Sequence, residues 1–92
     1  MKNIFKKTFS ELTTAEPLEI RGIGESPLTP AQLSGLWSVV NYRFENLLPT
    51  TTYTDKKPSE LCKALEIPGY KTLAYAIAGR LWEMGVERTS TV

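Results

Sequence analysis

Histidine is absent from this 92-residue sequence, cysteine and aspartate each occur once, and no long hydrophobic run interrupts the chain. Without histidine, imidazole acid–base catalysis and imidazole metal ligation are excluded. The single cysteine, Cys62, can form neither an intramolecular disulfide nor a cysteine zinc site, which suits a reducing compartment. The carboxylates are spread along the sequence without an obvious pair. We therefore expect no enzyme activity, no metal and no cofactor.

The lack of a long apolar run also bears on membranes, because a spanning helix needs about 20 apolar residues. The first residues, MKNIFKKTFSEL, carry lysines but no continuous apolar segment, so they do not form a secretory signal. We expect a cytoplasmic protein without a membrane partner. Residues 1–12 are interpreted as a short helix that docks on the core. The alternative is a basic amphipathic anchor for a membrane or an acidic partner.

Charge is nearly balanced, with 11 Lys and Arg against 10 Asp and Glu and a formal net charge of +1. A protein that depends mainly on phosphate neutralisation is usually far more basic. A small local excess of positive charge falls in residues 56–92. The length and the composition predict one soluble domain with a single core.

The strongest helix signal lies at residues 29–48. Thr29 is a capping residue, Pro30 suits the first helical position, and Gln32 completes a capping box. Pro49 ends the pattern. The apolar stripe follows a 3.6-residue period and is expected to face the core. Its members are Leu33, Leu36, Trp37, Val40, Phe44 and Leu47, with Leu48 beside them.

Residues 1–28 are expected to form an N-terminal arm with one short strand at 18–21, where apolar and polar residues alternate. Gly22-Ile23-Gly24 is interpreted as a turn, because a phosphate-binding fingerprint needs a third glycine and a helix start in register. Residues 50–55, TTTYTD, favour either a loop or a short edge strand.

Residues 58–66 and 72–84 predict two helices joined by a turn at Pro68-Gly69. Gly85 is expected to end the second helix in a Schellman motif, with a left-handed backbone. Residues 86–92 favour a strand by composition. The best partner for 86–91 is the strand at 18–21, so we expect a two-stranded sheet.

The segment PSELCKALEI–PGY–KTLAYAIAGRLWEMGVER resembles the second helix, turn, third helix and first wing strand of winged helix-turn-helix domains. It is similar in particular to those of phage and plasmid replication and regulatory proteins. The resemblance covers residues 57–92, and the helix at 29–48 would stand for the first helix. It implies a mainly α domain of winged helix-turn-helix type with a small β component, and a role in binding double-stranded DNA.

Under this resemblance the third helix would offer a face to the major groove. The candidate contacts to nucleic acid or to a protein partner are Lys56, Lys57, Lys71, Thr72, Tyr75, Arg80 and Arg88. Trp82 is interpreted as a core residue, with an exposed aromatic contact as the alternative. The first hypothesis is a DNA-binding regulator or replication accessory protein. The alternative is a small interaction or inhibitor protein that binds and blocks a host macromolecular machine. A third is a homodimer that packs through Ala74, Ala78 and Gly79.

Overall fold

The computed structural model describes residues 8–88. Within this range, four helices and three strands follow one another in the order α1 (Phe9–Leu12), β1 (Leu18–Arg21), α2 (Pro30–Glu45), β2 (Thr50–Thr54), α3 (Pro58–Leu65), α4 (Lys71–Met84) and β3 (Val86–Arg88). The helix expected over residues 1–12 is therefore described only at its end, and residues 89–92 of the expected terminal strand lie outside the described part.

The three strands form a parallel sheet in the order β1-β2-β3, so the expected pairing of 18–21 with 86–91 is wrong. Leu18 pairs with Thr50 and Thr52 pairs with Val86, which places β2 at the centre. The segment at 50–54 is neither a loop nor an edge strand. Helical crossovers connect β2 to both of its partner strands. Because neither partner strand is adjacent to β2 in the sequence, no hairpin pattern indicates that residues 50–54 form a strand.

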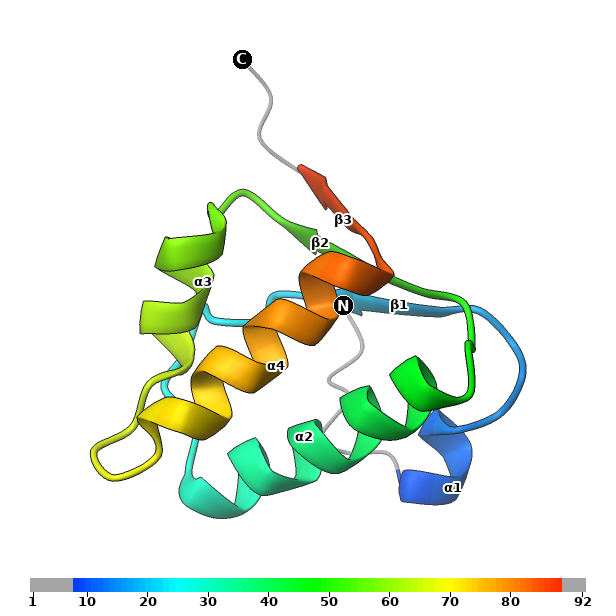
Figure 1. Ribbon diagram of the computed structural model, residues 1–92, viewed down its shortest axis with the longest axis horizontal. Coiled ribbons are helices and arrows are strands. Elements are labelled where there is room, and N and C mark those ends of the chain that lie inside the picture. The colour runs from blue at the N-terminus through cyan, green and yellow to red at the C-terminus, as the bar shows by residue number, and fades with distance from the viewer. Residues whose placement is uncertain (1–7, 89–92) are drawn as a thin grey trace.

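All the long helices cover one face of the sheet (Figure 1). Successive crossovers that move in the same direction across a sheet, with the usual right-handed sense, place their helices on the same side. The buried residues of β1 and β2 alternate accordingly, with Ile20 and Thr52 facing the helices. The buried core is built from one cluster of ten residues: Ile20, Ile23, Leu33, Leu36, Val40, Leu61, Leu65, Ala74, Ile77 and Leu81.

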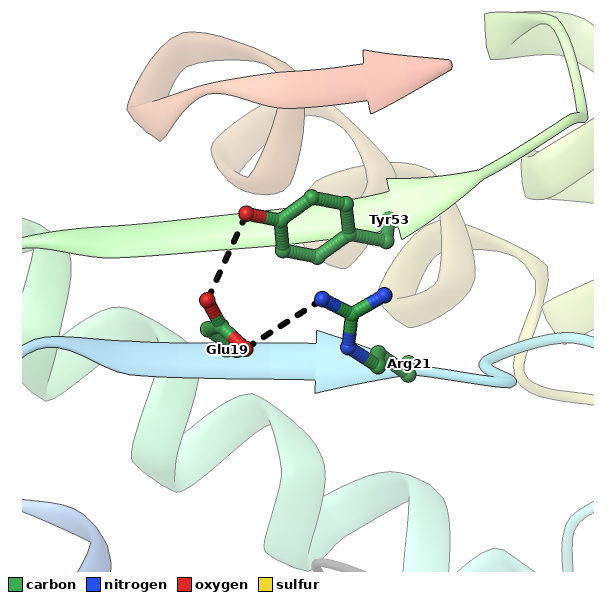
Figure 2. A network of polar contacts seen from close by, with 3 residues as sticks. All are labelled: Glu19, Arg21 and Tyr53. Carbon is green, nitrogen blue, oxygen red and sulfur yellow. Dashed lines mark hydrogen bonds and ion pairs between the residues drawn. The ribbon is translucent and has the colours of Figure 1, made fainter. Parts of the chain in front are cut away.

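No helix among residues 8–88 covers the other face of the sheet, which is unusual because parallel sheets are normally covered on both faces. Polar side chains occupy this face. Glu19 accepts hydrogen bonds from Arg21 at 3.3 Å and from the Tyr53 hydroxyl at 3.4 Å, and the Arg21 guanidinium lies 3.9 Å from the centre of the Tyr53 ring (Figure 2). Contacts of this kind are screened by water and contribute little stability, but they keep the open face hydrophilic.

The capping signals identify helix beginnings well. The Thr29 side chain accepts from the Gln32 backbone N–H at 3.1 Å, and Gln32 accepts in return from the Thr29 N–H at 3.0 Å, as expected. A second capping box, between Thr8 and Glu11, begins α1. The helix expected over residues 72–84 begins one residue earlier. Tyr70 occupies the cap without a side-chain hydrogen bond, and Lys71 is the first helical residue.

One buried arginine ties the domain together. Arg43 lies on α2, is 1% exposed, and donates five hydrogen bonds through its guanidinium. Its Nε donates to Thr50 Oγ1 at 2.7 Å. Its two terminal nitrogens donate at 2.7–3.0 Å to the backbone carbonyls of Leu12, Thr14, Glu16 and Pro49. The segment after α1 is thereby fixed to the beginning of β2.

Gly85 does not adopt the left-handed conformation expected of a Schellman motif, because its φ of 132° and ψ of 124° lead directly into β3. Replacement by alanine is expected to lower the free energy of unfolding by about 1–3 kcal/mol, since this region of φ and ψ is open almost only to glycine. The nearest atom to an added Cβ, Thr50 O at 3.7 Å, leaves enough room, so the cost is backbone strain. Urea unfolding measures it. Gly79→Ala on the exposed face of α4, where an added Cβ meets nothing, is the control and should stabilise by up to about 1 kcal/mol.

Thr52, in the central strand, is 0% exposed, and its hydroxyl has no hydrogen-bond partner among the described residues. Thr52→Val is expected to raise the free energy of unfolding by about 1 kcal/mol, because it removes a buried unsatisfied group and keeps the branched shape. Thermal unfolding would show a rise of about 4–8 °C. Thr50→Val is the matched control. It should have the opposite effect, since Thr50 Oγ1 accepts from Arg43 and donates to the carbonyl of Leu48.

Candidate functional site

Three of the predicted contact residues share the beginning of α4. Lys71, Thr72 and Tyr75 are all exposed, and the Tyr75 side chain is 74% exposed. This part of the helix therefore faces solvent. The homodimer surface expected on the same helix is wrong, because Ala74 and Ala78 are both buried in the protein and only Gly79 is accessible.

Arg80 is held against α2. Its guanidinium carbon lies 4.4 Å from the centre of the Phe44 ring and 5.6 Å from that of Trp37, and its Nε donates to Asn41 Oδ1 at 3.3 Å. The side chain is half-buried, so it does not extend into solvent as a base-reading arginine would. Its charge stabilises the contact between α2 and α4 through the aromatic faces.

The remaining predicted contacts are dispersed. Lys56 and Lys57 precede α3, whereas Lys71 is the first residue of α4. Arg88 belongs to β3, and its side chain is outside the described part of the structure. Trp82 is half-buried and packs against the core cluster, in agreement with its interpretation as a core residue.

A different surface lies where α2 and α4 end. The residues that line a groove of about 490 Å³ there include the half-buried Phe44, Leu48 and Met84 and the exposed Leu47, Glu45 and Glu83. We call the four apolar residues, Phe44, Leu47, Leu48 and Met84, the Leu47 patch. Leu47 was expected on the buried stripe of α2, but that expectation is wrong. The helix ends at Glu45, and the Leu47 side chain is 89% exposed.

The conformation of Leu47 is as unusual as its exposure. With a φ of 55°, it is the one non-glycine residue with positive φ among residues 8–88. The backbone N–H of Leu48 donates to the Arg43 carbonyl at 2.9 Å, and that of Leu47 donates to the Phe44 carbonyl at 3.3 Å. These are the two bonds of a Schellman motif, in which glycine normally occupies the left-handed position. A leucine at this position lowers the free energy of unfolding by about 1–2 kcal/mol. Because its side chain is exposed, no burial of apolar surface offsets this cost.

The charges around the Leu47 patch are acidic. Glu45 and Glu83 are exposed, and neither forms an ion pair with a described residue. The one basic side chain that lines the groove is Arg43, whose N–H groups are all engaged within the protein. Burial lowers the pKa of the Arg43 guanidinium.

A second, smaller hollow of about 340 Å³ lies between the loop at residues 24–28 and the end of α3. Gly22 and Gly24 both have positive φ and form the expected turn. At Gly24 an added Cβ would lie 3.1 Å from the Ala64 Cβ, so glycine lets this loop approach α3 closely. The Gly-x-Gly sequence is therefore explained by packing.

Residues 8–88 contain no group of three or more His, Cys, Asp or Glu side chains arranged to hold a metal ion. Within the same part of the chain, no helix has the length and apolar character needed to cross a membrane. Comparison with protein-family models, with curated proteins and with solved structures finds no match for this chain.

Proposed function

We propose that this protein is a non-enzymatic interaction module that binds another protein through the Leu47 patch. The observation that supports the proposal is Leu47 itself, an 89% exposed leucine held in a left-handed backbone conformation beside an apolar groove. Strained residues that persist in a fold cluster at functional sites. Burying one leucine side chain in a complex contributes about 1.5–3 kcal/mol, which offsets its cost in the free protein.

The neighbouring residues suit a protein partner. Phenylalanine and methionine are enriched at the centres of interfaces, whereas charged residues are depleted there and remain at the rim. All four residues concerned line the groove, Phe44 and Met84 half-buried, Glu45 and Glu83 exposed. Phe44 is also held in place by the stacked Arg80, so this wall of the groove is formed before a partner binds.

Leu47→Gly is expected to separate stability from binding. Glycine relieves about 1–2 kcal/mol of left-handed strain and costs about 0.5–1 kcal/mol through the greater freedom of the unfolded chain. The free energy of unfolding should therefore rise by about 0.5–1 kcal/mol, while partner binding is lost. Urea unfolding measures the first effect, and capture of partner protein by the immobilised chain measures the second.

Leu47→Met is the matched control for this experiment, since methionine keeps an apolar side chain on the same strained backbone. It should capture the same partner as the unaltered protein, whereas Leu47→Gly should not. A Leu47→Gly protein that retains the partner fully would overturn the proposal.

Double-stranded DNA is a second candidate ligand, favoured by the joint exposure of Lys71, Thr72 and Tyr75 at the beginning of α4. Binding through this face would weaken steeply with salt and would fall on substitution of Lys71 by alanine. Fluorescence anisotropy with a labelled duplex tests it. Absence of binding at low salt would exclude this candidate and leave the Leu47 patch unaffected.

A further inference from the structure

The charges around the Leu47 patch indicate what kind of segment it binds. We infer that its occupant is a short peptide segment of a partner protein, with an apolar anchor flanked by lysine or arginine. This inference rests on the proposed function and adds the chemistry of the partner.

Two exposed carboxylates give the groove its acidic character. Glu45 is the last residue of α2 and Glu83 is the next-to-last residue of α4, and both line the same groove. The side-chain amide of Asn41 donates to Glu45 Oε1 at 3.3 Å, one turn earlier on α2, which restricts where this carboxylate lies. Since neither carboxylate has an ion-pair partner among the described residues, both are available to cations of a ligand.

The backbone adds negative potential to the same place. The carboxyl ends of α2 and α4 lie on the same side of the domain (Figure 1), and the last residue of each helix, Glu45 and Met84, lines the groove. The carboxyl end of a helix carries the equivalent of about half a negative charge, and it favours cations within its last turn. Arg43, whose donors are all occupied within the protein, presents no free N–H group to the groove, and Arg80 is not among the residues that line it.

The shape of the groove favours a segment over a flat protein face. Its volume of about 490 Å³ lies within the range of roughly 300–1,000 Å³ typical of concave binding sites. The apolar walls would receive one anchor side chain, and the two carboxylates would receive basic side chains on either side of it. The exposed Leu47 would cover the anchor from the margin.

A second copy of this chain is a poorer occupant. A symmetric dimer formed through this patch brings the same surface from both molecules together. Glu45 and Glu83 of one molecule would then approach those of the other, and like charges across an interface are unfavourable. Charge complementarity therefore points to a basic partner of a different kind.

The test uses three short synthetic peptides that share one pattern of leucines at helical spacing and differ in the intervening residues, which are lysine, glutamine or glutamate. Each is titrated into the isotopically labelled full-length chain, and backbone amide signals are followed by NMR. The lysine peptide should shift the signals of residues 44–48 and 83–85. It should bind about tenfold more tightly than the glutamine peptide, as two partly exposed charge contacts would give. The glutamate peptide should bind most weakly.

Two variants test which residues of the chain produce the preference for the lysine peptide. The double variant Glu45→Gln with Glu83→Gln should lose most of the preference for the lysine peptide while still binding the glutamine peptide, and high salt should act in the same direction. Leu47→Gly should weaken all three peptides alike, because it removes the apolar contact and leaves the charges in place.

Equal binding of the three peptides at residues 44–48 would overturn the inference that the partner segment is basic and would leave the proposed function intact. Absence of shifts at these residues with every peptide would also overturn the inference. Failure of the proposed function is a separate result, namely undiminished partner capture by Leu47→Gly. Concentration-dependent dimerisation in sedimentation, abolished by Leu47→Gly, would assign the patch to a second copy and overturn the inference as well.

Discussion

Replacing Arg43 by lysine is expected to lower the free energy of unfolding by about 3–5 kcal/mol, a large share of the roughly 5–14 kcal/mol typical of a chain this size. Lysine has three N–H donors where arginine has five. At least two of the five acceptors would therefore lose their partner within the protein. Each buried acceptor left unsatisfied costs about 1–3 kcal/mol, and the ammonium group would remain buried without a carboxylate beside it.

The contacts of Arg43 explain why this loss should be cooperative. Its guanidinium joins three places in the fold, namely the segment at residues 12–16, the end of α2 and the beginning of β2. Lysine cannot reproduce the planar fork that reaches all of them. Urea unfolding should show a much lower midpoint, and amide exchange should show early opening of residues 12–16.

Arg21→Lys is the matched control, because the same substitution falls there on the open face of the sheet. Arg21 makes one exposed ion pair and stacks on Tyr53 (Figure 2), so its loss should cost no more than about 1 kcal/mol. If the Arg43 variant were as stable as the Arg21 variant, the five hydrogen bonds of Arg43 would contribute no more than a surface contact.

The position of Arg43 could have been inferred from the sequence, although its role could not. It lies seven residues after Leu36 and three after Val40, on the buried stripe of α2. A charged residue on such a stripe indicates a buried polar network. The acceptors lie 27–31 residues earlier in the chain and 6–7 residues later, and nothing in their sequence marks carbonyl groups as partners.

Helices and sheet differ in how far the sequence determines them. Capping residues and periodicity are local, so the bounds of α2, α3 and α4 are within three residues of those expected. Pairing in a parallel sheet is not local, because each crossover separates the partners by about 30 residues. Residues 50–54 also present three threonines to the core, so β2 lacks the alternation of apolar and polar residues that indicates a half-buried strand.

Part of the candidate site could have been predicted from the segment Asn46-Leu47-Leu48-Pro49. A proline soon after a helix end is typical of a Schellman motif, so Leu47 could have been placed at its left-handed position. The approach of Glu83 and Met84 to this segment could not have been inferred, since it depends on how α4 packs on α2. The same packing explains Arg80, which the helical pattern placed in solvent and which the aromatic rings of α2 hold instead.

Leu81→Ala is expected to lower the free energy of unfolding by about 2–5 kcal/mol. Leu81 lies on α4, is fully buried and belongs to the core cluster formed by the sheet and the helices above it. Its truncation removes the transfer free energy of the lost carbons and leaves a cavity that α2 and β2 can close only in part. Since about 1 kcal/mol shifts the melting temperature of a domain this size by about 4–8 °C, the variant should melt at least about 8 °C lower.

Leu47→Ala is the control, because it makes the same chemical change at the exposed leucine of the Leu47 patch. Alanine retains the left-handed strain, and the side chain that is lost touches water already, so stability should change by less than about 0.5 kcal/mol. The two variants together also test the proposed function. Leu81→Ala should lower stability and leave partner affinity unchanged at temperatures where the protein is folded. Leu47→Ala should leave stability unchanged and lower the affinity for the partner. If both variants lost affinity to the same degree, binding would depend on the stability of the fold and not on the Leu47 patch.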